Sequence, residues 1–545
     1  MRYAGEKRFN VWTALTLILL ALFLAFVIYP IGMLLIKSLF TDGEVDLSYF
    51  VKFFTKKYYW GSLVNSFKVT VVSTLVAALI GVPMAYMLRS VRIPGSGLIN
   101  ILIVISYLSP PFIGAYSWIQ LLGRNGFFTK ILNSLLGVKL NGIYGFAGIV
   151  LVFSLQSFPL IYMYVSGAMK NLDNSLNEAA ESLGCNVFQR VTKIIFPLVM
   201  PSLLAGSLLV FMRVFSDFGT PMIIGEGYKT FPVMLYTQFM GEVGTNDGFA
   251  ATMCLIVIVI ALMFFFIQQL LGRKFSYSMT GTAKGWRKVC VYLAVYLIAL
   301  VAALPQITVL VTSFIGTING SLFTGEFTLD NYRNIFAKGN TVAITNSYLF
   351  GLTAIVIVVV CGILISYLSV RKRSALTSIL DVLTMFPYII PGSVLGISFL
   401  YAFNGPPFLL GGTALIIIIS LSIRRMPYTI RSSTAIIGQI SPSIEEASIS
   451  LGASQMKTFL QVTIPMMLPG VLSGAIMSWI TLISELSSSV ILYTSKTMTL
   501  TVAIYSEVIR SNFGNAAAYS TILTLSSIVS LLLFFKLSGK KDLSV

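Results

Sequence analysis

Long apolar segments alternate with short polar ones along the chain, and apolar runs longer than ~18 residues recur throughout. A helix of about 20 apolar residues crosses the hydrocarbon core of a bilayer. The pattern therefore predicts an all-α polytopic membrane protein with about twelve transmembrane helices. The expected spans are 11–36, 65–88, 98–121, 142–167, a fifth ending near 224, 249–271, 289–314, 345–368, 376–403, 413–430, 471–493 and 516–537.

The spans form two similar sets of six, joined by a segment rich in Lys, Arg, Gly, Ser and Thr at 273–288. We predict a first half at 1–272, a cytoplasmic linker at 273–288 and a second half at 289–545. Asn65-Ser66 and Asn346-Ser347 open corresponding helices in the two halves. The first span is longer than the apolar core of a signal peptide, so we expect an uncleaved helix. Pro110-Pro111 predicts a break in the third span.

The most polar interruption of the pattern occurs twice. Residues 177–201 read NEAAESLGCNVFQRVTKIIFPLVMP, and residues 445–469 read EEASISLGASQMKTFLQVTIPMMLP. Glu178 aligns with Glu446 (446 − 178 = 268), and Gly184 aligns with Gly452 (452 − 184 = 268). Each copy predicts a short helix, a sharp turn at the glycine and re-entry into the membrane at a proline. Such a helix either docks on a partner or rests on lipid headgroups, and its duplication favours docking.

Composition agrees with a membrane protein, since 56% of residues are hydrophobic, only 10% are charged and the mean hydropathy is +0.88. The net charge of +18 could indicate nucleic-acid binding. With a cytoplasmic amino terminus, however, 23 of the 37 Lys and Arg residues fall in cytoplasmic segments, 13 fall outside and Arg213 lies within a helix. This positive-inside bias explains the charge without nucleic acid and predicts that both termini are cytoplasmic. It also assigns Arg424-Arg425 to the cytoplasmic side.

Several kinds of chemistry are disfavoured by what the sequence lacks. There is no histidine, and the four cysteines show no CxxC spacing, so we expect no stably bound metal and no zinc hydrolase. No G-x-x-x-x-G-K-[ST] phosphate loop is present, so the chain is not expected to hydrolyse ATP. A membrane enzyme is therefore the weakest of the function classes.

The repeated polar stretch resembles the cytoplasmic EAA loop in the permease subunits of bacterial ABC importers. The first copy, within 171–201, carries the motif residues Glu178, Ala179, Ala180 and Gly184. The second copy, within 440–469, carries Glu446, Ala447 and Gly452 and departs at Ser448, Val462 and Ile464. The helix pattern around both copies is similar to the type I importer permease fold, so the resemblance covers nearly the whole chain.

The resemblance implies that each loop forms a coupling helix that docks on an ATP-binding subunit. Two copies of an ABC ATP-binding subunit would then bind one chain and hold the ATP and Mg, with no cofactor in this chain. The resemblance also implies the bacterial cytoplasmic (inner) membrane and an extracytoplasmic substrate-binding protein. The acidic cluster Asp42, Glu44 and Asp46 is a candidate contact for that protein.

A second repeated feature follows each EAA loop, where Asp217 aligns with Glu485 (485 − 217 = 268). Carboxylates inside spanning helices are costly and usually face a cavity or a partner. Arg213 is a possible partner for Asp217 at i−4, whereas Glu485 has none nearby in sequence. These three residues are candidates for the translocation pathway. The acids either make structural contacts or provide transient oxygen contacts for a cation.

Fused permeases with D-F-G in one half and E-L-S in the other resemble ferric-iron importer permeases, so we expect ferric iron as the cargo. Similar permeases carry thiamine, phosphonates or other small anions, which remain alternatives. A gradient-driven secondary transporter would also have about twelve helices and internal repeats. It would not require duplicated EAA loops, and uptake without an ATPase partner would identify it.

Overall fold

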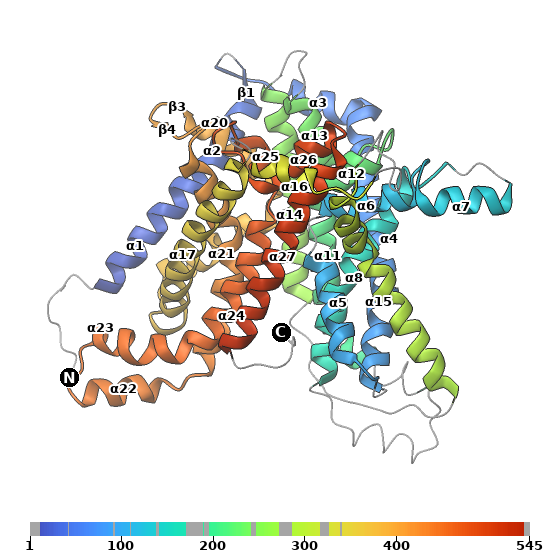
Figure 1. The fold of residues 1–545 in the computed structure, drawn as a ribbon. Coiled ribbons are helices and arrows are strands. Elements are labelled where there is room, and N and C mark those ends of the chain that lie inside the picture. The colour runs from blue at the N-terminus through green and yellow to red at the C-terminus, as the bar shows by residue number, and fades with distance from the viewer. Residues whose placement is uncertain are drawn as a thin grey trace.

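A computed structural model describes residues 11–41, 43–90, 93–108, 111–137, 141–170, 189, 196–240, 247–271, 286–316, 326–337 and 341–538. This part of the chain is a bundle of tilted helices, with short helices and two small hairpins at one end (Figure 1). Helix α22 lies at the opposite end, away from the bundle (Figure 1).

The first half contains six long helical segments with shorter helices between them. Its elements are α1 (Val11–Phe23), a π-helical turn η1 (Leu24–Ile28), α2 (Tyr29–Leu39), β1 (Phe40–Thr41), β2 (Glu44–Val45), α3 (Ser48–Thr55), α4 (Lys57–Ser90), α5 (Ser96–Leu108), α6 (Pro111–Leu122), α7 (Phe127–Leu136), α8 (Phe146–Lys170), α11 (Phe196–Ser216), α12 (Gly219–Ile224), α13 (Phe231–Met240) and α14 (Asp247–Leu271).

The second half has a similar series of long helices, but its hairpin follows the third span instead of the first. Its elements are α15 (Trp286–Ser313), α16 (Asp330–Phe336), α17 (Val342–Arg371), α18 (Ala375–Leu383), α19 (Phe386–Ile389), α20 (Gly392–Phe403), β3 (Asn404–Gly405), β4 (Phe408–Leu409), α21 (Ala414–Gln439), α22 (Pro442–Ser450), α23 (Gln455–Thr458), a π-helical turn η3 (Phe459–Thr463), α24 (Ile464–Ile483), α25 (Ser489–Leu492), α26 (Leu500–Ile509) and α27 (Phe513–Ser538).

Each of the twelve predicted spans contains one or more helices in the described residues. Within the described residues, eight helices are long and apolar enough to cross a membrane, and a pair bent by 110° at Ala375–Ile389 and Gly392–Phe403 gives a ninth. The third predicted span is broken, as the prolines indicated, because α5 ends at Leu108 and α6 begins at Pro111. The predicted fifth and eleventh spans are wrong as continuous helices. In the fifth, α11 ends at Ser216 and α12 begins at Gly219; in the eleventh, α24 ends at Ile483 and α25 begins at Ser489.

The first helix of each half packs on the other half. Helix α1 contacts α17 and α18, and α2 contacts α20 as well as α14. In return, α15 packs against α5 and α6 of the first half, where the Thr312 hydroxyl donates a 2.8 Å hydrogen bond to Gln120 Oε1. Both of these polar side chains are buried. The exchange joins the two halves over the full depth of the bundle.

The internal repeat is visible in matched hydrogen bonds. Ser66 Oγ accepts from the Phe231 amide at 2.7 Å, and Ser347 Oγ accepts from the Leu500 amide at 2.6 Å. The neighbouring asparagines act alike, since Asn65 Nδ2 donates to the Lys229 carbonyl and Asn346 Nδ2 donates to the Lys496 and Met498 carbonyls. Each Asn-Ser pair therefore fixes the start of the short helix, α13 or α26, that precedes the last span of its half. The predicted correspondence of the helices that carry these pairs, α4 and α17, is confirmed, but neither pair opens its helix, since α4 begins at Lys57 and α17 at Val342.

Candidate functional site

Helix α22 forms an exposed surface at the end of the bundle opposite the hairpins (Figure 1). Pro442 occupies its first turn, where a missing backbone donor costs nothing, and no residue of the helix is buried. Glu446 and Ala447, both predicted to contact an ATPase, are exposed. The structure thus leaves these two residues accessible to a partner.

The turn after α22 depends on Gly452, which has φ +90°. Only glycine adopts this conformation at little cost, so the predicted turn is confirmed. The preceding Leu451 is 90% exposed at the tip of the turn. After the turn, Ser454 caps α23 by accepting a 3.2 Å hydrogen bond from the Lys457 amide.

An ion pair fixes α22 to the bundle. Arg371, at the end of α17, places its Nε 2.9 Å from Glu445 Oε1 and donates from Nη2 to the Ile440 carbonyl at 2.6 Å. The Arg371 and Glu445 side chains are only 11% and 13% exposed. Glu446 was singled out from the sequence, but Glu445 was missed. The basic run at 371–373 could have indicated an ion pair with one of these two acids.

The concave side of this helix-turn-helix segment is a surface cavity of about 450 Å³. Apolar and small side chains dominate its lining, with one lysine at the edge. The lining residues are Ile444, Ala447, Ser448, Leu451, Gly452, Ala453, Lys457 and Val462. An exposed apolar surface of this kind is typical of an interaction site.

The corresponding motif residues of the first copy, Glu178, Ala179, Ala180 and Gly184, lie outside the described residues. So does Asp42 of the acidic cluster. Glu44 is exposed in β2, whereas Asp46 accepts hydrogen bonds from the amide and hydroxyl of Ser48. These two bonds lower the pKa of the Asp46 carboxyl, so it is held as an anion at the start of α3.

The first helix of the chain reaches the segment that follows α22. Trp12 of α1 is buried and donates from Nε1 to Gln455 Oε1 at 3.0 Å. Its ring lies 4.8 Å from that of Tyr367 and 5.3 Å from that of Phe459. The hydroxyl of Tyr367 donates to Glu445 Oε2 at 3.4 Å. These contacts connect α22 and the segment after it to α17 and to α1.

Asp217 and Glu485 lie where the fifth helix of each half is broken. Asp217 Oδ1 accepts from the Thr220 amide at 3.0 Å, and Glu485 Oε1 accepts from the Ser488 amide at 3.2 Å. The two acids therefore play the same local role, satisfying an amide three residues ahead as a helix cap does. This structural role was one of the two expected from the sequence.

The partners of the two acids differ from the sequence interpretation. Glu485 pairs with both Arg424 and Arg425, which project from the middle of α21. Placing Arg424-Arg425 in a cytoplasmic segment was wrong, because α21 continues to Gln439 and buries both side chains. A basic pair within an apolar run is the signal that could have indicated this, since ionisable residues at membrane depth face the protein interior.

Arg213 makes a different contact from the expected one. Its guanidinium lies 4.5 Å from the centre of the Tyr107 ring, and no ion pair joins it to Asp217 in the described part of the chain. A guanidinium over an aromatic face is stabilised by the ring quadrupole. Tyr107 also interacts electrostatically with Arg425 of the other half. The arginines of the two halves therefore face one shared region.

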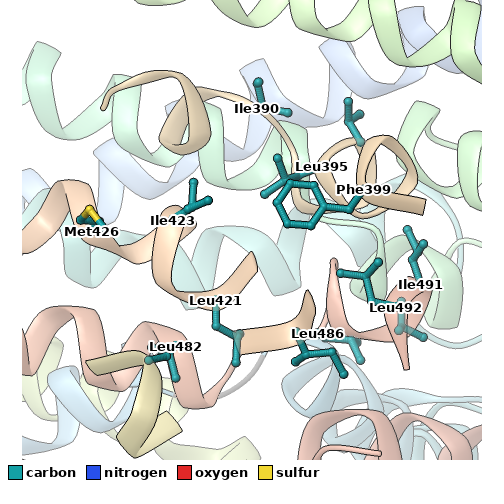
Figure 2. Packing of buried hydrophobic residues seen from close by; sticks show 14 of the residues in the cluster. Ile390, Leu395, Phe399, Leu421, Ile423, Met426, Leu482, Leu486, Ile491 and Leu492 are labelled. Atoms are coloured by element: carbon teal, nitrogen blue, oxygen red, sulfur yellow. The ribbon is translucent and has the colours of Figure 1, made fainter. Parts of the chain in front are cut away.

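Apolar packing surrounds this charged cluster. Figure 2 shows Ile423 and Met426, which bracket the two arginines on α21, among the buried side chains of α19, α20, α24 and α25. Gly392 allows the close approach, because a Cβ there would lie 2.8 Å from Arg424 Cζ and 2.7 Å from Ser487 Cβ. Among the described residues, no group of three or more Cys, Asp and Glu side chains is arranged to hold a metal ion.

Two separate segments, 77–277 and 359–539, match the family of binding-protein-dependent transport system inner membrane components. The chain belongs to this family. As a member with two copies of the family domain, it is a fused permease, a multi-pass protein of the inner membrane, and it works with ATP-binding partners and a substrate-binding protein.

Several relatives of this permease have names that indicate a cargo. The ferric transport system permease protein FbpB of Actinobacillus pleuropneumoniae is 29% identical over 97% of this chain and 78% of its own length. A putative ferric transport system permease protein FbpB 1 of Haemophilus influenzae is 29% identical over 90% of this chain and 79% of its own. A putative 2-aminoethylphosphonate transport system permease, PhnU of Salmonella typhimurium, is 27% identical over 48% of this chain and 91% of its own.

Proposed function

We propose that this permease moves ferric iron, released by an extracytoplasmic binding protein, into the cytoplasm by ATP-driven alternating access. The main support is the full-length similarity to two permeases named for ferric transport. The phosphonate-named relative matches only about half of the chain, so a phosphonate is the second candidate cargo. Both candidates need the same machinery on the cytoplasmic side.

We propose that the α22 surface receives an ATP-binding subunit, and that the corresponding loop at 171–201 receives a second copy. The support is the exposed motif residues, the apolar cavity of about 450 Å³ and the exposed Leu451. ATP and Mg would be bound by those subunits. Both termini and both loops would then face the cytoplasm.

Force applied to α22 would reach the membrane part by two routes. One runs through the Glu445–Arg371 ion pair into α17. The other runs through α23 and η3 into α24, which ends just before Glu485. When the two ATP-binding subunits close, the halves would rock as rigid bodies around the region between Asp217 and Glu485.

The test is ATP hydrolysis and uptake by the assembled complex in proteoliposomes, with binding protein loaded with ferric iron, with 2-aminoethylphosphonate or with thiamine. Stimulation and uptake with ferric iron alone support the proposal. Stimulation by the phosphonate or thiamine alone refutes the choice of cargo. Uptake driven by an ion gradient in the absence of any ATP-binding subunit refutes the importer mechanism.

A further inference from the structure

The charged cluster between the halves carries more positive than negative groups. Its cations are Arg213, Arg424 and Arg425, and its anions are Asp217 and Glu485, which interact electrostatically with each other. Within the described residues this leaves one positive charge in excess. Figure 2 shows Ile423 and Met426, which flank Arg424 and Arg425 in the sequence, among buried apolar side chains, where water compensates a charge poorly.

Hydrogen-bond donors in the cluster are also left unused. The Nε atoms of Arg424 and Arg425 have no hydrogen-bond partner. Both atoms are buried, and the whole Arg424 side chain is only 10% exposed. Three hydroxyls on the segments that contact the arginines also lack a hydrogen-bond partner, those of Ser393, Ser488 and Ser489. Other buried hydroxyls of the described residues also lack a partner, but Arg424 and Arg425 supply the only cationic donors among these groups. Buried donors are nearly always satisfied in proteins, so these two call for an acceptor.

The fold itself does not require the arginines. The positions that match Arg424 and Arg425 in the first half are Gln156 and Ser157 (424 − 156 = 268, 425 − 157 = 268). Helix α8 nevertheless packs against α4 and α11 as α21 packs against α17 and α24. Asp217 accepts its amide hydrogen bond without a close arginine ion pair, although Arg213 interacts with it electrostatically, and Glu485 could do the same. A purely structural role for the ion-paired residues Glu485, Arg424 and Arg425 therefore does not explain why the second half has two buried arginines.

The cluster also does not suit a bare cation. Hard cations bind carboxylate oxygens, but both oxygens of Glu485 are engaged by guanidinium groups. Three guanidinium groups would repel a metal ion, whereas they match the planar oxygens of phosphate and carboxylate. The cation route through paired acids, one of the two expectations from the sequence, is therefore disfavoured.

We propose that Arg424 and Arg425, with Arg213 across the interface, form an oxyanion site, so that the cargo crosses as an anionic species. Together with the proposed function, this means a ferric ion accompanied by phosphate or carboxylate ligands. The anion site itself does not depend on iron being the cargo. Ser393, Ser488 and Ser489 would supply the remaining donors to the anion.

The test is equilibrium binding to the full-length chain in lipid nanodiscs, with radiolabelled inorganic phosphate, citrate and ferric citrate as separate probes. We expect saturable binding of at least one probe. Arg424→Gln and Arg425→Gln should each weaken that binding roughly tenfold or more, the value of a charge-assisted hydrogen bond. Arg213→Gln breaks no ion pair within the described residues, although it removes the longer-range electrostatic interaction with Asp217, so it should fold normally and also weaken binding.

Arg431→Gln is the matched control. Arg431 lies on the same helix, is half-exposed and pairs with Asp381 at 3.5 Å, outside the cluster. The Arg431→Gln variant should bind the probe as tightly as the wild-type protein does. If no probe binds saturably, or if the three cluster variants bind like Arg431→Gln, the anion site is refuted. If phosphate or citrate binds but the assembled transporter takes up no iron, the anion site stands and the ferric cargo is wrong.

Discussion

The ion pair between Arg371 and Glu445 is the best-defined link between the α22 surface and the membrane helices. Replacing Arg371 with Ala removes the 2.9 Å contact to Glu445 and the 2.6 Å hydrogen bond to the Ile440 carbonyl. It also leaves the Glu445 carboxylate, only 13% exposed, with the weak 3.4 Å contact to Tyr367. The variant should therefore loosen α22 without unfolding the bundle.

The size of the effect follows from the burial of the pair. Breaking a fully buried ion pair costs about 3–5 kcal/mol, and an exposed pair contributes about 0–1 kcal/mol. With both side chains mostly buried but close to the surface, we expect about 2–4 kcal/mol. Since 1.36 kcal/mol corresponds to a factor of ten, local opening of α22 should become roughly 30 to 1,000 times more frequent.

Hydrogen exchange of the α22 amides, measured on the full-length protein in nanodiscs, reads this opening directly. The Arg371→Ala variant should lose protection at 442–452 by that factor, while α17 and α24 stay protected. Arg373→Ala, two residues on and exposed, is the control and should change nothing. Unchanged protection in Arg371→Ala would show that the ion pair does not hold α22.

Four further substitutions test other parts of the structure. Gly452→Val forces φ +90° on a β-branched residue, at about 1–3 kcal/mol, and should reduce co-purification of the ATP-binding subunit; Gly438→Ala, whose Cβ meets nothing, should not. Glu485→Gln leaves two guanidinium groups without a carboxylate and should cost about 3–5 kcal/mol in thermal unfolding. Asp217→Asn keeps its capping oxygen and should cost under about 1 kcal/mol, so equal losses would contradict these roles. Trp12→Ala should destabilise the protein by about 3–5 kcal/mol. A melting temperature like that of the wild-type protein would show that the buried Trp12 ring does not stabilise the fold.

Hydrophobic patterning was sufficient to predict the helices and the repeat, because the bilayer requires long apolar runs and the fold duplicates them at one spacing. The turn at Gly452 was also predictable, since a glycine between two short helices indicates a left-handed residue. The matched Asn-Ser pairs were recognised as equivalent, and the structure adds what they bind.

Long-range electrostatics could not be read from the same pattern. The charge-sorting rule treats any basic pair as a loop, so it misplaced Arg424 and Arg425, whose acidic partner is 60 residues away in sequence. The break after Ser216 was missed although Gly219 and Pro221 follow it, because Asp217 was considered as a pathway residue or a structural contact and not as the carboxylate that stabilises the new helix start. The role of Glu445 required knowing that α17 ends beside α22.

The exchange of first helices has a consequence for how the protein is made. Helix α2 ends at Leu39, and the helices of the second half that α1 and α2 contact begin at Val342, 303 positions later (342 − 39 = 303). Ribosomes add about 5–20 residues per second, so the first helix inserted waits roughly 15–60 s for the part of its packing surface that the second half supplies. During that time Trp12 has neither Gln455 nor Phe459 to contact. The earliest part of the nascent chain is thus among the last to be packed, and a ribosome that stalls before α17 leaves it exposed to lipid and to proteases.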